Sequence, residues 1–235
     1  MTESSDAKIS VDPQTEGESY VVVFPNTNNN VELISDSGKK VTFLNGINAG
    51  SIYTVGWEEY EGNNGYEYVD LGLPSGLKWA TFNVGANTPE EYGDYFAWGE
   101  IETKDEYTLN NSITWNKEIS NISGNTTYDA ATVNWGEDWR IPTQGEMKEL
   151  IDNCTWTRTQ LNGVNGYNVT GTNGKSIFLP AAGYYRESYY TEQIGNYWTS
   201  SPGTDNQKAH NLVFNNTNYG IGNNDRVCGG TIRPV

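Results

Sequence analysis

Two pairs of adjacent glutamates are the first residues in the chain that could carry acid–base chemistry. They are Glu58 with Glu59 and Glu90 with Glu91. A glycoside hydrolase needs two carboxyl groups on opposite sides of the bond that it cleaves. Neighbouring residues on an extended segment point to opposite faces, so neither pair can flank one bond. We therefore interpret all four as solvated surface acids.

Nucleophilic and metal chemistry have equally little support. Ser200 and Ser201 could pair with His210, the only histidine, but no Gly-x-Ser-x-Gly elbow surrounds either serine. The chain has two cysteines and no Cys-x-x-Cys pair, so it lacks the usual ligands of a zinc site. We predict that the protein is not an enzyme and that it needs no metal and no cofactor.

Tyrosine and asparagine are the residue types that favour a binding function. Four tyrosines at positions 184, 185, 189 and 190 crowd one polar stretch, and asparagines crowd residues 206–224. Tyrosine offers rigid amphipathic contact area, asparagine offers adaptable hydrogen bonds, and aromatic rings stack on sugar faces. The residues that we predict to bind a ligand are Tyr189, Tyr190, Arg186, Asn206, His210, Asn216, Asn218, Tyr219 and Asn223.

The alternative is that tyrosines on strands are core residues and that asparagines only make turns. This is the better interpretation for Tyr184, Tyr197 and Trp198, whereas the residues proposed above lean towards surface recognition.

The charge of the chain narrows the range of partners. The 235 residues carry a formal net charge of −16, which repels the phosphates of nucleic acids and anionic membranes. No apolar run approaches the roughly 18 residues that span a bilayer. We expect no nucleic-acid partner and no membrane insertion. The acidic start lacks the features of a signal peptide, so either the chain is cytosolic, or a signal was removed or the start is truncated; we favour the second explanation.

One confident helix follows Pro142. Thr143 and Glu146 have the spacing of a capping box. Met147, Leu150, Ile151 and Cys154 then recur at helical spacing and form one apolar stripe. A helical turn is also expected over 129–135.

The remaining elements are predicted to be strands. Five short strands are expected between residues 7 and 55, with a central apolar strand at 20–24 and an Asn45–Gly46 hairpin. Hairpins are expected around 74–76 and 173–174, and a closing sheet is expected from 195–201, 209–214 and 226–234. The acidic, Gly- and Asn-rich stretch 56–65 is a linker candidate. We divide the chain into a small β-strand module with a loose tail (1–58) and a larger domain (59–235).

Ordered motifs from residue 68 onwards carry a resemblance to a known family. They are YVDLGLPSGLKWAT (68–81), YGDYFAWGE (92–100), WRIPT (139–143), CTW (154–156), IFLPAAG (177–183), YWTSS (197–201) and the end RVCGGTIRPV (226–235). On these motifs, residues 66–235 resemble the Fibrobacter-type major paralogous domain family. That resemblance implies an α+β, C-type-lectin-like domain with two helices, a curled antiparallel sheet and long loops.

The family resemblance also bears on calcium and on the cysteines. Sugar-binding animal C-type lectins hold calcium with Glu-Pro-Asn and Trp-Asn-Asp motifs; the first is absent, and Asn224–Asp225 is only a fragment of the second. Many family members have cysteine where Phe82 stands. Cys154 then either pairs with Cys228, as a helix-to-last-strand disulfide of this fold class would, or both are buried free thiols.

The first module has a weaker resemblance. YVVVFP (20–25), KVTFL (40–44) and AGSIYT (49–54) resemble the last strands of fimbrillin-type pilus subunits; a generic β-sheet module is the alternative.

Together these observations predict a protein of the outer-membrane surface or the extracellular space of a gut bacterium. We expect non-enzymatic adhesion to a glycan or to a host or bacterial surface protein, with pilus subunits as further candidate partners. The alternatives are a structural subunit of a surface fibre and a retroelement-diversified variable protein with a changeable C-terminal region. A further alternative is a hydrolase with an unrecognised carboxylate pair.

Overall fold

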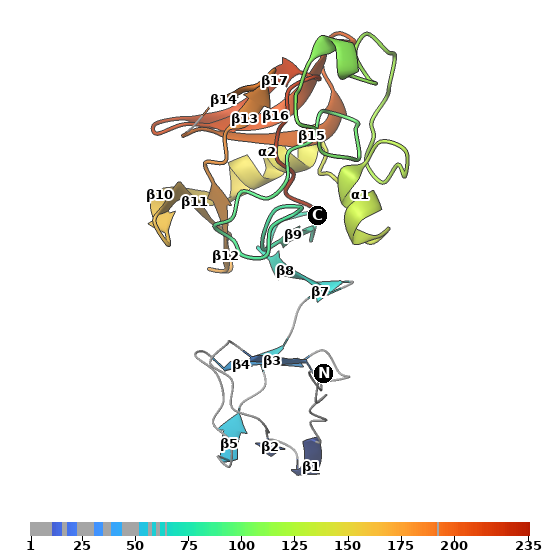
Figure 1. The fold of residues 1–235 in the computed structure, drawn as a ribbon. Helices are drawn as coiled ribbons and strands as arrows, with labels where there is room; N and C mark the ends of the chain where they lie inside the picture. The colour runs from blue at the N-terminus through green and yellow to red at the C-terminus, as the bar shows by residue number, and fades with distance from the viewer. Residues whose placement is uncertain are drawn as a thin grey trace, which may run out of the picture. The chain divides into compact units, whose positions relative to one another are not determined.

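The computed structural model describes residues 65–191 and 193–235 in full. In the preceding part it describes only the backbone of strands within 11–15, 18–22, 31–34, 39–43, 52–55, 58–59 and 62–63. The chain divides into two compact units, Met1–Gly62 and Asn63–Val235, whereas the boundary expected from the sequence follows residue 58. Figure 1 shows the elements of both units.

The first unit consists of short antiparallel strands. They are β1 (Val11–Thr15), β2 (Glu18–Val22), β3 (Val31–Ile34), β4 (Lys39–Phe43), β5 (Ile52–Val55) and β6 (Glu58–Glu59). The strand orders are β1-β2-β5 and β3-β4-β6, so the apolar run that begins at Tyr20 lies in a central strand, as predicted. Asn45–Gly46 lies outside the described residues. The hairpin expected there stays a prediction.

The second unit is mixed α+β with mostly strands. After β7 (Gly62–Asn63), at the boundary between the units, its elements are β8 (Tyr66–Asp70), β9 (Lys78–Ala80), the 3-10 helix η1 (Leu109–Asn111), α1 (Ala130–Trp135), α2 (Gln144–Asn153), β10 (Thr155–Leu161), β11 (Val164–Thr170), β12 (Ser176–Pro180), β13 (Tyr184–Arg186), β14 (Tyr189–Thr191), β15 (Gly195–Pro202), β16 (Lys208–Phe214) and β17 (Tyr219–Asp225). In the described residues no helix is long and apolar enough to cross a membrane.

Helix α2 forms where the capping box predicts it. The Thr143 hydroxyl accepts from the Glu146 N–H, and Glu146 accepts from the Thr143 N–H. The guanidinium of Arg140, which precedes the helix, donates two hydrogen bonds of 2.8 and 2.6 Å to the Glu146 carboxylate. Burial on its own raises the pKa of Glu146, but the hydrogen bonds from Arg140 and Thr143 outweigh it, so the pKa is lowered. A charged Glu146 therefore stabilises this helix start.

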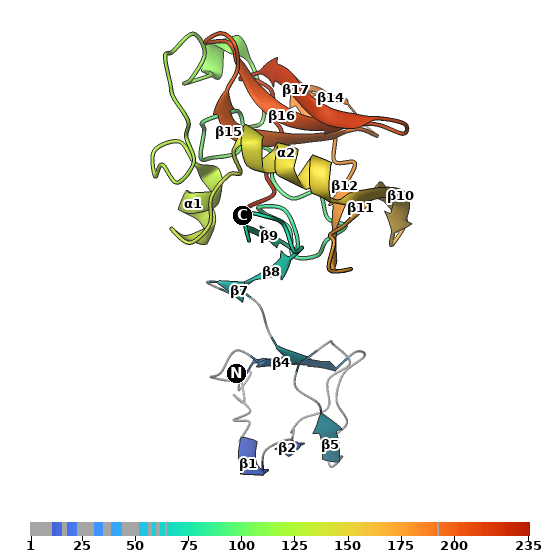
Figure 2. The same ribbon diagram turned by 180° about the vertical axis from the view of Figure 1, so that it is seen from behind.

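The sheet β15-β16-β17 separates two groups of buried side chains. Successive residues of a strand point to opposite faces, so Tyr197 and Trp198 enter different groups. The α2 cluster contains Met147, Leu150, Tyr197, Leu212 and Phe214 among others. The tryptophan cluster contains Trp98, Trp135, Trp139, Trp198 and Ala209 among others. Figure 2 shows α2 lying across one face of this sheet.

The third strand of this sheet differs from the sequence prediction. The third strand is β17, which pairs with β16 in register from Lys208↔Asp225 to Phe214↔Tyr219. The prediction that residues 226–234 form this strand is therefore wrong. Residues 226–235 are instead buried at every position and make only isolated bridges, for example Phe96↔Gly230. Thr231 makes one of these bridges with Tyr197 of β15, so the composition of this segment reflects burial beside the sheet, not a regular strand of it.

The C-terminal segment is hydrogen-bonded to β9, near the beginning of the second unit, and to Arg140. The Ala80 N–H donates to the Pro234 carbonyl, and Arg140 and Val235 exchange two backbone hydrogen bonds. The fully buried Arg233 donates to the side chain of Asn83 and to the carbonyls of Ala80, Thr81 and Phe178 at 2.9 to 3.1 Å. Burial lowers its pKa to about 10.

Two hairpins and the cysteines complete the comparison with the sequence. The turns at Gly76 and Gly174 have positive φ of 71° and 83° and join β8 to β9 and β11 to β12, as predicted. Cys154 and Cys228 are both free thiols in the structure. Of the two alternatives given for them, the structure therefore has the free thiols and not the disulfide. Burial raises the pKa of each to about 11.

Candidate functional site

The nine predicted binding residues lie on three segments of the second unit. Arg186, Tyr189 and Tyr190 are on the β13–β14 hairpin. His210 and Asn223 face each other across β16 and β17, and Asn206 lies in the connection before β16. Asn216, Asn218 and Tyr219 form the β16–β17 turn and the start of β17. The structure therefore does not gather all nine into one site.

The β13–β14 hairpin is fixed at its base and open at its tip. Tyr185 exchanges two backbone hydrogen bonds of 2.9 Å with Gly229, and Glu187 exchanges two with Tyr107. Glu187 adopts a positive φ of 54° in the two-residue turn. Tyr189 follows this turn and is 74 % exposed, the largest value among the exposed apolar side chains of the described residues. A rigid backbone therefore presents one tyrosine ring to solvent.

Four tyrosine rings pack together below this tip. Tyr185 meets Tyr95 edge-on with ring centroids 4.8 Å apart, Tyr107 in a stacked arrangement at 6.0 Å, and Tyr190 at 4.9 Å. The hydroxyls of Tyr95 and Tyr190 both donate to the Ala182 carbonyl, at 2.5 and 2.7 Å, and Tyr107 donates to the Tyr95 carbonyl. Burial raises the pKa of Tyr107 to about 12 and raises the pKa of Tyr95 further. These phenols are neutral at physiological pH, and their rings are held in place.

A cavity of about 270 Å³ opens beside these rings. Its lining residues are Asp94, Tyr95, Thr103, Lys104, Asp105, Tyr107 and Tyr185. We call it the tyrosine cavity. Lys104 pairs with the buried Glu100 and donates to the Asn111 carbonyl at 2.6 Å. Asp94 and Asp105 are exposed, and within the described residues their carboxylates make no hydrogen bond and no salt bridge.

Arg186 does not offer a free cation to a ligand. Its guanidinium pairs with Asp225 at 2.5 Å, and this hydrogen bond raises the pKa of Arg186. The pair ties the hairpin to the end of β17. Tyr219 begins β17 at its opposite end, about 20 Å away along a strand of this length, so the two tyrosine surfaces are separate.

The β16–β17 turn is built from its own hydrogen bonds. The Asn215 side chain accepts from the N–H groups of Thr217 and Asn218 at 2.9 and 3.0 Å, which is an Asx-type turn. Tyr219 stacks on Trp156 with centroids 4.6 Å apart and remains 41 % exposed. Part of the asparagine content of this region therefore serves turn formation, the alternative recognised from the sequence.

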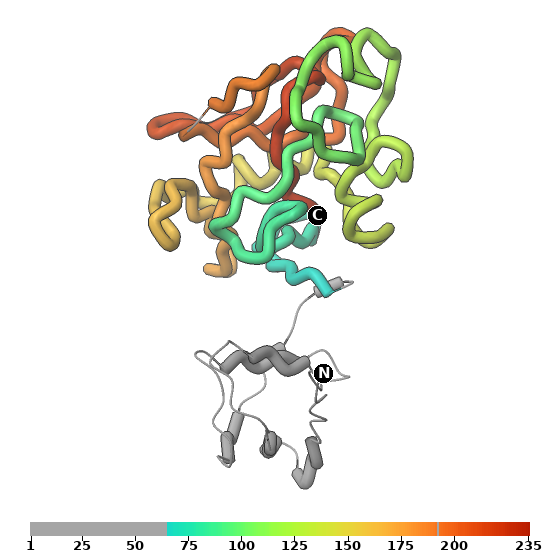
Figure 3. Tube along the Cα trace, viewed as in Figure 1, coloured from blue at the N-terminus to red at the C-terminus, as the bar shows by residue number. Residues whose placement is uncertain are grey.

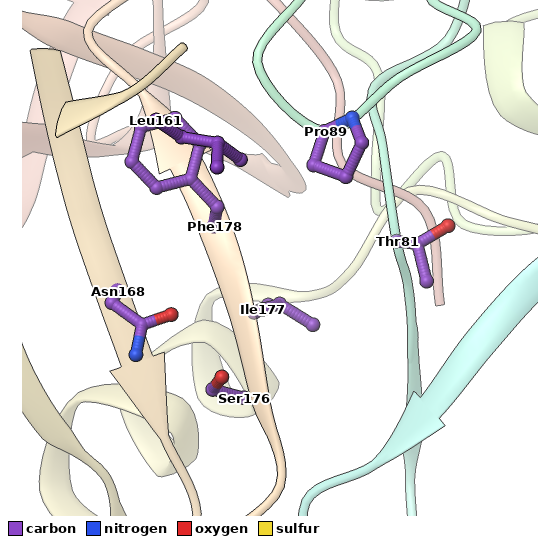
Figure 4. Close-up of a pocket in the computed structure, with 7 residues that line it drawn as sticks. All are labelled: Thr81, Pro89, Leu161, Asn168, Ser176, Ile177 and Phe178. Carbon is purple, nitrogen blue, oxygen red and sulfur yellow. The ribbon is translucent and has the colours of Figure 1, made fainter. Parts of the chain in front are cut away.

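A second cavity of about 220 Å³ lies between β12 and the segment after β9. Figure 4 shows Leu161 and Phe178 on one side and Pro89 and Thr81 on the other, with Asn168 and Ser176 at the strand side. Asn162 donates to Glu90 at 2.6 Å and links the two sides. No predicted binding residue lines this cavity.

Ser200, Ser201 and His210, which could have suggested catalysis, do not line either cavity. The His210 ring lies 3.3 Å from the Gly222 carbonyl, and the Ser201 hydroxyl accepts from the Gln144 N–H. Ser200 is fully buried. Among the described residues, no three His, Cys, Asp or Glu side chains gather as a metal site would require.

Sequence reasoning missed most of the tyrosine cavity. Tyr107 comes from the irregular segment between β9 and α1, which Figure 3 follows as a long looped trace. A single tyrosine in a polar loop was the only local signal for it. Asp94 lies inside one of the family-like motifs, which gave no indication that its carboxylate is free.

Comparison of the chain with protein-family models, with curated proteins and with solved structures finds no match. A functional assignment therefore depends on the residues described above.

Proposed function

We propose that this protein is a non-enzymatic surface recognition protein that binds a glycan or protein ligand through the β13–β14 hairpin and the tyrosine cavity. The observation that carries the proposal is Tyr189, which is 74 % exposed on a hairpin anchored by four backbone hydrogen bonds. Exposed aromatic rings on rigid elements are typical anchors of binding sites.

Further exposed apolar side chains lie on the loop that contains Tyr107. Leu109 and Ile113 are 52 % and 51 % exposed. They follow Tyr107, whose backbone is hydrogen-bonded to Glu187 in the turn of the hairpin. An apolar contact flanked by the carboxylates of Asp94 and Asp105 would suit a ligand with both apolar and polar faces.

The lectin-like fold and the surface location are part of the same proposal. Two helices, several antiparallel sheets and a C-terminus bonded to β9 support the lectin-like interpretation of the second unit. A net charge of −16 suits a soluble, exposed protein that attracts basic partners. The first unit would then serve as the attachment module, and pilus association is one form that this could take.

An array of glycans and of host and bacterial surface proteins tests the proposal with the full chain. Binding should be retained in chelator and should fall at least about tenfold with Tyr189→Ala, as for an interface hot spot. Tyr189→Phe should retain most of the binding because the ring remains. Val133→Ala is the control, since Val133 is 43 % exposed on α1. Binding that is unchanged by Tyr189→Ala would contradict the proposal.

A further inference from the structure

The tyrosine cavity combines two kinds of group that both attract positive charge. The faces of Tyr95, Tyr107 and Tyr185 carry the negative part of the aromatic quadrupole. The carboxylates of Asp94 and Asp105 carry full negative charges. A cation that enters the cavity would therefore lie among these tyrosine rings and the two carboxylates.

The positive charge of the lining is already compensated. Lys104 is the only cationic residue among those that line the cavity, and its ammonium is paired with Glu100 and bonded to the Asn111 carbonyl. The nearby Arg186 is paired with Asp225. Asp94 and Asp105 are thus the uncompensated charges, and an anionic ligand such as a phosphate or an acidic sugar would be repelled.

Two of the three tyrosine hydroxyls of the lining are engaged inside the protein. Those of Tyr95 and Tyr107 donate to backbone carbonyls inside the protein, so what these residues offer to the cavity is their rings. Fixed rings lose little conformational entropy on binding.

We infer that the tyrosine cavity binds an alkylammonium group, in contact with the tyrosine rings of the lining and paired with Asp94 and Asp105. This inference rests on the proposed function and names the chemistry of its ligand. The cavity of about 270 Å³ has room for a trimethylammonium group or for the end of a lysine side chain. The source is therefore either a small free amine of the choline type or a lysine of a protein ligand.

Titration calorimetry of the full chain with choline chloride tests the inference. Its matched neutral probe is 3,3-dimethyl-1-butanol, which has the same shape without the charge. Choline should bind about tenfold more tightly than the neutral probe, as a partly desolvated cation–π contact would give. Asp94→Asn and Asp105→Asn should each weaken choline binding about fivefold, as expected for loss of one charge at close range in water. The control is Glu102→Gln, an exposed acid of the same loop outside the lining.

A second pair of probes separates the two sources. Nα-acetyl-lysine methylamide and its Nε-trimethyl form should bind more tightly than choline if the cavity takes a lysine side chain, and more weakly if it takes a free amine. Equal binding of choline and the neutral probe would overturn the inference. So would no detectable binding of any ammonium probe, or unchanged choline affinity in both Asp variants.

The two proposals fail in different ways. If array ligands depend on Tyr189 but choline does not bind, the surface function stands and the ammonium inference is wrong. If choline binds while no array ligand depends on Tyr189, the cavity is an ammonium site and the surface function is wrong.

Discussion

Replacing Arg233 by methionine should lower the free energy of unfolding of the second unit by about 3–5 kcal/mol. The Arg233 guanidinium is fully buried. It donates to Asn83 at 2.9 Å, to Ala80 and Thr81 at 3.1 and 3.0 Å, and to Phe178 at 2.9 Å. Methionine fills much of the same volume but removes the Arg233 donor from all four of these acceptors.

The magnitude follows from two opposing effects. A buried acceptor that loses its partner costs about 1–3 kcal/mol, so four of them cost roughly 4–12 kcal/mol before any relaxation. Burying the charged guanidinium also costs several kcal/mol in the wild type, and the substitution removes that cost. The expected destabilisation of about 3–5 kcal/mol is the cost at the four acceptors minus the desolvation cost that the substitution removes.

Urea unfolding followed by tryptophan fluorescence measures this change. Trp57 is the only tryptophan before the second unit, and seven lie within it, so the signal reports mainly on that unit. Lys148→Met is the matched control because Lys148 is exposed and pairs only with Asp152 across one helical turn; it should change stability by no more than about 0.5 kcal/mol.

A second variant guards against misinterpretation. Arg233→Lys keeps the charge but cannot reach four acceptors in different directions, so it should destabilise at least as much as methionine. An Arg233→Met protein as stable as the wild type would refute the reasoning, since desolvation of the guanidinium would then outweigh its hydrogen bonds.

Three further predictions follow from the same geometry. Because the folded pKa of Glu146 is lowered from 4.5, its stabilisation is present above pH 4.5 and is lost as the pH falls below it; Glu146→Gln should flatten that acid slope in urea unfolding, and an unchanged slope would contradict this. Gly183 has a φ of 68°, and a Cβ there would overlap the Thr191 carbonyl oxygen, so Gly183→Ala should displace the β13–β14 hairpin and cost at least ~2 kcal/mol; wild-type stability with intact array binding would argue against it. With Cys154 half-buried and Cys228 fully buried as free thiols, a thiol reagent should label Cys154 first and Cys228 only on unfolding, whereas two unreactive cysteines in denaturant would indicate a disulfide.

Local signals with a clear physical cause predicted their elements well. The capping box at Thr143 and the positive-φ glycines at 76 and 174 each fix a short-range geometry, and α2 and two hairpins form there. The Asn162–Gly163 pair carries the same kind of signal and was not used. Both residues have positive φ, 49° and 86°, in the two-residue turn between β10 and β11.

Other features depend on long-range packing, which the sequence pattern does not contain. β17 is rich in glycine and asparagine and has low strand propensity, yet it pairs with β16 over its whole length. The last segment has strand-like composition, yet it is buried and makes only isolated bridges, one of them to β15. The tyrosine cavity likewise joins segments near residues 94, 104 and 185. The exposed hairpin tyrosine was predictable from composition, but the cavity beside it was not.

Hydrogen–deuterium exchange of the full chain with its best array ligand tests the central claim most directly. The account predicts slower exchange in residues 94–107 and 184–191 when the ligand is bound, with little change at 215–219. Protection confined to 215–219 or to the first unit, with none at the hairpin, would contradict it.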